Sequence, residues 1–205
     1  MRARGLVVAA VVVAVGLLAG VAAAGPLTLT AEQQQRLAAG EIVVLDVRPP
    51  GSDPNVGGGT ALAVVKAPVE AVWAVLTDYP GHPRYYPNLV SAEVLETKGT
   101  RVLLRYTVRI GLLTFSFHMN KVPDPAARRI EWQLAPDRPN GLLRENSGYW
   151  LVEPRPGGSL VTYAIAVRSY VPGFLTAGSE QRSLVDTITG LRRVVAGQPG
   201  RAADR

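Results

Sequence analysis

The chain has 205 residues, of which 47% are apolar, and it carries a formal net charge of +6 at pH 7. This length suits one domain with short additions, and the lack of cysteine excludes disulfides, thiol nucleophiles and thiolate metal sites. Only two histidines are present, which argues against a histidine-rich metal site, and the basic residues are too dispersed for the single basic face of a nucleic-acid binder.

Residues 1–24 have the order of regions that is typical of a secretory signal peptide. Met1–Arg4 contains two arginines, and Gly5–Ala24 is uncharged, apolar and ends in three alanines. Cleavage is expected before Gly25. The alternative is an uncleaved anchor, because the apolar run approaches the roughly 20 residues that span a bilayer. Both interpretations predict an exported domain, located in the periplasm or cell envelope or secreted.

Residues 25–59 are expected to form an N-terminal extension. Leu27–Gly40 is typical of a short helix, in which Thr30 and Gln33 are placed to form a capping box. Glu41–Arg48 is rich in β-branched residues and predicts a strand. The composition of Pro49–Gly59 indicates a Gly-rich loop.

Residues 60–196 are predicted to form one domain. It begins with a strand at Thr60–Lys66, followed by a short helix that starts at Pro68. Alternation of apolar and polar residues then predicts antiparallel strands with one buried face. These strands are Val90–Glu96, Arg101–Ile110, Thr114–Lys121, Arg129–Leu134, Gly148–Glu153 and Ser159–Tyr170. A helix with one apolar stripe is expected from about Phe174 to Val195, and residues 197–205 are expected to be a disordered tail.

Several of these segments resemble the START/polyketide-cyclase/birch-pollen-allergen superfamily, and most of all its coenzyme Q-binding and START-like bacterial branch. The resemblance is carried by Ala67–Trp73, Leu76–Tyr79, Tyr86-Pro87, the strand at Gly148-Tyr149-Trp150 and the last helix. It implies an α+β helix-grip fold, in which a curved, seven-stranded antiparallel sheet wraps around a long C-terminal helix and leaves an apolar cavity. The strand at Glu41–Arg48 is additional to this pattern, either as an extension or as an edge strand.

The apolar strand faces and the last helix would line such a cavity. Each large side chain there could instead simply fill the core, but as a set they fit an apolar pocket with a few polar anchors. Tyr106 and Tyr163 are candidate anchors, because a buried phenol needs a partner. The predicted ligand-binding residues are Tyr106, Phe115, Phe117, Met119, Trp132, Trp150, Tyr163, Ile188 and Leu191.

Two apolar segments at strand ends are candidates for the cavity entrance or for membrane contact. They contain Leu112 and Leu113 in one turn, and Phe174 and Leu175 before the last helix. The alternative is that both segments pack against the body of their own domain.

No catalytic, metal or cofactor site is predicted. His82 lies in a Pro-Gly-His-Pro turn and His118 on a strand face assigned to solvent, so both are interpreted as surface histidines. No pair of carboxylates shares an inward face, as acid–base catalysis would require. Gly57–Gly59 lacks the spacing of a dinucleotide fingerprint.

The sequence therefore predicts an exported, non-enzymatic binder or carrier of a hydrophobic ligand, such as a lipid or isoprenoid quinone, with transient membrane contact and no nucleic-acid partner. One alternative is an enzyme of the polyketide cyclase or aromatase type, which would need an inward polar residue near Tyr106 or Tyr163. Another is a cell-envelope interaction module without a ligand. The oligomeric state is not predicted.

Overall fold

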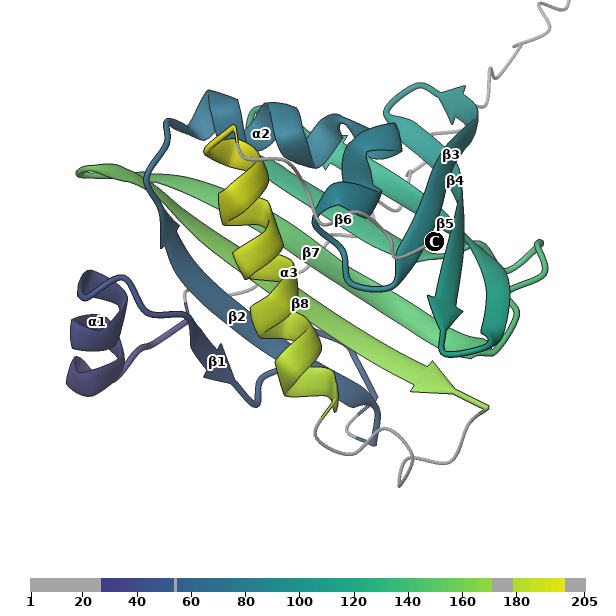
Figure 1. Cartoon of the computed structure of the whole chain (residues 1–205), viewed down its shortest axis with the longest axis horizontal. Coiled ribbons are helices and arrows are strands. Elements are labelled where there is room, and N and C mark those ends of the chain that lie inside the picture. The colour runs from purple at the N-terminus through teal and green to yellow at the C-terminus, as the bar shows by residue number, and fades with distance from the viewer. Residues whose placement is uncertain (1–26, 54, 171–178, 198–205) are drawn as a thin grey trace, which may run out of the picture.

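The computed structural model describes residues 27–53, 55–170 and 179–197, and Figure 1 shows their arrangement. The described helices are α1 (Ala31–Ala38), α2 (Val69–Thr77), the short 3-10 helix η1 (Tyr79–Arg84) and α3 (Ser179–Val195). The strands are β1 (Val43–Leu45), β2 (Gly57–Val65), β3 (Leu89–Lys98), β4 (Arg101–Ile110), β5 (Leu113–Asp124), β6 (Arg129–Leu134), β7 (Leu143–Arg155) and β8 (Gly158–Ser169).

The strands form one antiparallel sheet in the order β1-β2-β8-β7-β6-β5-β4-β3. Consecutive strands from β3 to β8 pair as hairpins, whereas β2 pairs with β8, which places the first and last strands of the predicted domain side by side. The predicted sheet is thus confirmed in type, but it has eight strands rather than seven. The additional strand is β1, which pairs with residues 60–62 of β2 at the edge of the sheet.

Helix α3 lies across one face of the sheet, and α2 with η1 lies near one end of that face (Figure 1). The largest hydrophobic cluster fills the space between this face and α3, and it includes Ile188 and Leu191 from the helix. Gly190 lets α3 approach η1 closely, because a Cβ atom at that position would lie 2.5 Å from the carbonyl oxygen of Tyr85. We call the buried residues between sheet and α3 the aromatic interior.

Helix α1 packs on the opposite face of the sheet. Its Leu37 is buried against Val43 of β1 and Leu62 of β2, which form a second, smaller cluster. Because side chains alternate along β2, Leu62 points away from the face that carries Ala61 and Ala63. The predicted capping box of α1 is present, since Thr30 and Gln33 bond each other's backbone N–H groups.

Three segments differ from the expectations. Gly57–Gly59, which were expected in a Gly-rich loop, begin strand β2, because they pair with residues 165–167 of β8. The residues after α2 form the 3-10 helix η1, where the sequence indicated only a turn. Strand β7 begins at Leu143, five residues before the predicted start, because its polar first residues pair with β8. The first part of the predicted last helix, which contains Phe174 and Leu175, lies outside the described residues. Among the residues that are described, no helix has both the length and the apolar character to span a bilayer.

Candidate functional site

The nine predicted ligand-binding residues lie together in the aromatic interior. Eight of them are buried, and Phe115 is partly buried and packs against the others. Their strands alternate as expected, so that β4, β5, β6, β7 and β8 each direct at least one of these side chains toward α3. The sequence pattern therefore identified which face of the sheet is apolar. Contact of these residues with a ligand stays a prediction.

A stack of three aromatic rings forms the centre of this interior. The ring of Tyr163 lies 4.2 Å from that of Trp150 and 5.8 Å from that of Trp132, and both pairs are stacked. Each indole is anchored by a hydrogen bond: Trp132 Nε1 donates to Asn146 at 3.0 Å, and Trp150 Nε1 donates to the hydroxyl of Tyr86 at 2.8 Å. Stacked pairs of this kind contribute about 0.5–1.5 kcal/mol beyond their buried area.

Gly148 makes room for this stack. A Cβ atom at Gly148 would lie 2.5 Å from the indole ring of Trp132, its partner on the neighbouring strand. Because Gly148 has no side chain, the ring of Trp132 can lie over this position of β7 and reach Tyr163.

His82 is not a surface residue, which corrects the prediction. Its side chain is fully buried, with the rings of Tyr79, Tyr85 and Tyr86 around it. Nε2 lies 3.0 Å from the carbonyl oxygen of Leu76 in the last turn of α2. The turn was interpreted as exposed because of its prolines and glycine, but η1 directs the imidazole inward, where it satisfies a carbonyl that the end of α2 leaves without an intrahelical partner.

These contacts fix the protonation of His82. A carbonyl oxygen only accepts hydrogen bonds, so Nε2 carries the proton and Nδ1 accepts from the hydroxyl of Tyr106 at 2.5 Å. Burial, with a smaller contribution from the charge of Lys121, holds the pKa of His82 well below its ordinary value. The imidazole is therefore neutral. The predicted anchor Tyr106 is thus bonded to the protein itself.

The other histidine, His118, is partly exposed and bonds the backbone carbonyl of Pro139, as expected for a residue near the surface.

Lys121 is the most unusual residue of the interior, and the sequence reasoning did not select it. It is fully buried, and its amino group has no hydrogen-bond partner among the described residues. The signal was present in the alternation of β5, because Phe115, Phe117 and Met119 point inward and Lys121 is the next residue in that period of two. It was missed because a lysine at the end of a strand is ordinarily assigned to solvent.

Four aromatic rings surround the amino group of Lys121. Their centroids lie 5.1–5.8 Å from Nζ, within the range of a cation–π interaction. We call this arrangement the Lys121 cage; its rings belong to Tyr79, Tyr86, Tyr106 and Trp132. The hydroxyl of Tyr79 is also buried and without a hydrogen-bond partner in the described part of the chain.

The cage does not fully compensate the burial of a charge. Burial lowers the pKa of Lys121 from 10.5 to about 7 and raises that of Tyr79 to about 12. No aspartate or glutamate is among the buried side chains of the described residues. Cation–π contacts of about 0.5–2 kcal/mol each stabilise the ammonium, but they replace none of the hydrogen bonds to water that its three N–H donors lose on burial. The interior therefore contains three buried donors without acceptors among the described residues, on Lys121, Tyr79 and Tyr85, and of these Lys121 and the ring of Tyr79 belong to the Lys121 cage.

The predicted entrance residues are exposed where they are described. The turn between β4 and β5 carries Leu112, which is fully exposed, and Leu113 and Ile110, which are 63% and 55% exposed. This turn does not pack against its own domain, so that alternative is wrong for Leu112 and Leu113. Phe174 and Leu175 lie outside the described residues.

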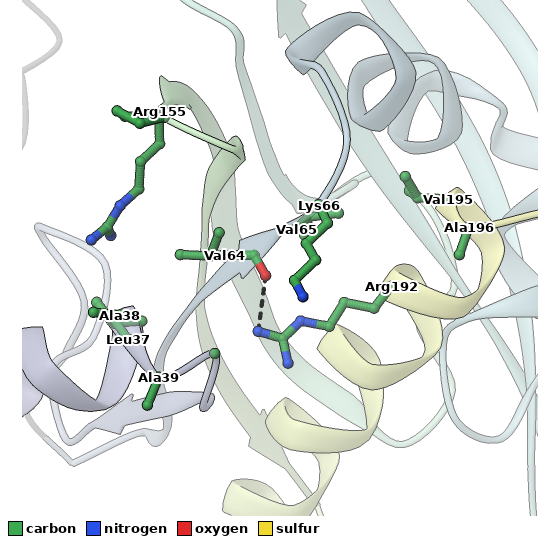
Figure 2. A pocket seen from close by; sticks show the side chains of 12 residues that line it. Leu37, Ala38, Ala39, Val64, Val65, Lys66, Arg155, Arg192, Val195 and Ala196 are labelled. Atoms are coloured by element: carbon green, nitrogen blue, oxygen red, sulfur yellow. Dashed lines mark hydrogen bonds between the residues drawn. The ribbon is translucent and has the colours of Figure 1, made fainter.

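A separate cleft lies near the edge of the sheet, between α1 and the C-terminal end of α3 (Figure 2). It has a volume of about 740 Å³, and three basic residues line it: Lys66, Arg155 and Arg192. Figure 2 shows Arg192 bonded to the carbonyl oxygen of Val64, at 3.0 Å. We call it the basic cleft. It contains none of the nine predicted ligand-binding residues.

In the described part of the chain, no group of three or more histidine, aspartate or glutamate side chains could hold a metal ion.

The comparison with protein families finds one match over most of the chain. The family model described as "Polyketide cyclase / dehydrase and lipid transport" matches residues 60–196. The comparison with curated protein sequences finds no match.

Solved structures share the fold. A STAR-related lipid transfer protein from Xanthomonas axonopodis is 18% identical, with a TM-score of 0.63 over 76% of this chain and 92% of its own. The Zhui aromatase/cyclase from Streptomyces sp. R1128 is 17% identical, with a TM-score of 0.58 over 67% and 92%. DR_A0006 from Deinococcus radiodurans is 28% identical, with a TM-score of 0.51 over 67% and 96%. The predicted superfamily and helix-grip fold are thereby confirmed, while the fold is common to proteins named for transfer and for catalysis.

Proposed function

Because the chain belongs to the polyketide cyclase/dehydrase and lipid transport family, we propose that it is an exported, non-enzymatic binder or carrier of a hydrophobic ligand such as a lipid or an isoprenoid quinone. The observation that supports binding in the interior is the presence of buried donors, Lys121 and Tyr79, among aromatic rings. Buried polar groups in proteins nearly always have a partner. A ligand with an apolar body and an acceptor group would supply one.

The binding step requires movement, because the rings of the interior already contact one another. A ligand would have to separate α3 from the sheet or rotate the side chains of Tyr86 and Trp132. Burial of its apolar surface, which contributes about 25 cal/mol per Å², would compensate for the ring contacts that are lost. Association is therefore expected to be slower than diffusion allows.

The test is native mass spectrometry of the chain purified from the cells that make it, followed by organic extraction. A stoichiometric apolar adduct would support the proposal and identify the class of ligand. A clean mass, with no uptake of added lipids or quinones, would contradict it and favour the interaction module.

Variants test where the ligand lies. We expect Trp132→Ala and Phe117→Ala to weaken ligand retention roughly tenfold, because each removes apolar surface of the interior. Tyr170→Ala, at a tyrosine that is 62% exposed, is the control. Retention is measured by native mass spectrometry on variants whose circular dichroism is unchanged. Equal retention in both interior variants and the control would place the ligand elsewhere.

A polyketide cyclase or aromatase activity is the second candidate. Such an enzyme needs an inward polar residue near Tyr106, and both His82 and Lys121 lie beside that ring. Incubation with a linear poly-β-ketone thioester would reveal cyclisation as loss of water by mass. Turnover that His82→Gln abolishes would favour the enzyme, and no turnover would leave the carrier.

A further inference from the structure

If the chain binds a hydrophobic ligand in its interior, as proposed above, the Lys121 cage indicates the chemical class of that ligand. Lys121 has no acceptor among the residues that the structure describes, and His82 does not serve as one. Its Nδ1 already accepts from Tyr106 and its Nε2 donates to Leu76. The groups around its amino group are the four rings of the cage, and one of these rings belongs to Tyr79, whose buried hydroxyl also has no partner in the described residues.

Two donors of this kind match a carboxylate. One ammonium balances a single negative charge, and the ammonium and the phenol together can bond both carboxylate oxygens. A phosphate monoester would bring more charge than one lysine neutralises, and no guanidinium is among the groups that face the amino group. A neutral ester or alcohol would leave the charge of the ammonium uncompensated.

We propose that Lys121, assisted by Tyr79, binds the carboxylate of an acidic amphiphile whose apolar body lies among the aromatic rings of the interior. The ligand class is thus a monocarboxylic acid with a long apolar part, rather than a neutral lipid.

A dependence on pH follows. His82 is neutral, and the pKa values of Tyr79, Tyr86 and Tyr106 are raised by burial, so these groups do not titrate near neutrality. Lys121 does, since its pKa is about 7 without ligand. A bound carboxylate favours the protonated amine and raises that pKa, so binding takes up a proton and the affinity falls as the pH rises above 7.

The experiment compares dodecanoic acid with methyl dodecanoate, which has the same alkyl chain and no charge. Binding to the full chain and to the variants Lys121→Met and Lys66→Met is followed by native mass spectrometry and by tryptophan fluorescence at pH 6.5 and 8.5. Lys66→Met is the matched control, because it removes a lysine from the basic cleft (Figure 2) and leaves the interior intact.

We expect the unaltered chain to bind the acid at least tenfold more tightly than the ester at pH 6.5, and this preference to shrink at pH 8.5. Lys121→Met should bind both compounds alike at either pH, and Lys66→Met should behave as the unaltered chain. Equal affinity for acid and ester in the unaltered chain would overturn the proposal and leave the proposed function standing.

Two other results would also overturn it. A preference that survives Lys121→Met and is lost in Lys66→Met would place the carboxylate in the basic cleft. Failure of all three proteins to bind either compound, or any lipid or quinone added in parallel, would contradict the proposed function itself, and this proposal with it.

Discussion

At the scale of single residues, Lys121 combines a cost to stability with a candidate role in binding. The unfolded chain protonates this lysine with an ordinary pKa of 10.5, whereas in the folded protein the pKa is about 7 because the amino group is buried. Between these values the unfolded state binds more protons than the folded state. The unfavourable contribution is therefore largest below pH 7, and it diminishes as the pH rises toward 10.5.

Replacement of the lysine tests this relation. Without ligand, Lys121→Met should raise the free energy of unfolding by on the order of 2–4 kcal/mol at pH 7, because the variant buries no charge. The gain should fall below about 1 kcal/mol at pH 10, where the native lysine is neutral and that of the unfolded chain only partly charged. Urea unfolding at several pH values measures it, with the exposed Lys66→Met as control. A gain that does not vary with pH would show that charge burial is not its cause.

The interior residues show what the sequence could and could not predict at this scale. Alternation along the strands placed Phe117, Trp132 and Tyr163 on one buried face, because a period of two is a local property. The inward direction of Lys121 also follows from alternation, but its surroundings and those of His82 come from residues distant in the chain: Tyr106 for His82, and rings from η1, β4 and β6 for Lys121. A single-sequence pattern does not contain those contacts.

At the scale of elements, the contact between α3 and η1 depends on a glycine. Gly190→Ala would add a Cβ atom 2.5 Å from the carbonyl oxygen and 2.8 Å from the Cα atom of Tyr85, and neither backbone atom can rotate away. We expect a loss of roughly 1–3 kcal/mol in the free energy of unfolding, although alanine is the better helix former by about 1 kcal/mol. Thr189→Ala, at an exposed neighbouring position in α3, should change the free energy of unfolding by only a few tenths of the loss expected for Gly190→Ala. Urea midpoints of the two variants decide; a stabilised Gly190→Ala protein would show that α3 does not lie against η1.

Elements were predicted best where their signals are local. The capping box correctly predicted Thr30 as the N-cap of α1, and strict alternation predicted β4 with its observed bounds, Arg101–Ile110. The early start of β7 was missed because Leu143–Ser147 has a polar composition, and it is the pairing of this segment with residues 166–169 of β8 that makes it a strand. The helix η1 was missed because its prolines and glycine are also the residues of an irregular turn.

At the scale of the whole molecule, the exposed β4–β5 turn is where contact with a membrane is expected. Leu112→Ser combined with Leu113→Ser should reduce binding to phosphatidylcholine vesicles at least tenfold, because insertion of each leucine contributes about 1.5–3 kcal/mol. Co-sedimentation with vesicles measures the effect. Val122→Ser, on an exposed part of β5 outside the turn, is the control and should bind as the unaltered chain does. Equal binding by the double variant would exclude this turn as the contact.

The pairing of β2 with β8 also determines when the molecule can fold. Residues 57–65 find their main partner, residues 159–167, only after roughly a hundred further residues have been synthesised. At about 5–20 residues per second, that interval lasts on the order of 5–20 s on the ribosome. During it the nascent chain holds a strand whose partner, within the part described, is the three-residue β1. Long-range closure of this kind slows folding. The same topology that completes the sheet therefore keeps the emerging polypeptide unfolded for longer, which is the state that the proposed export would require if it used a channel for unfolded chains.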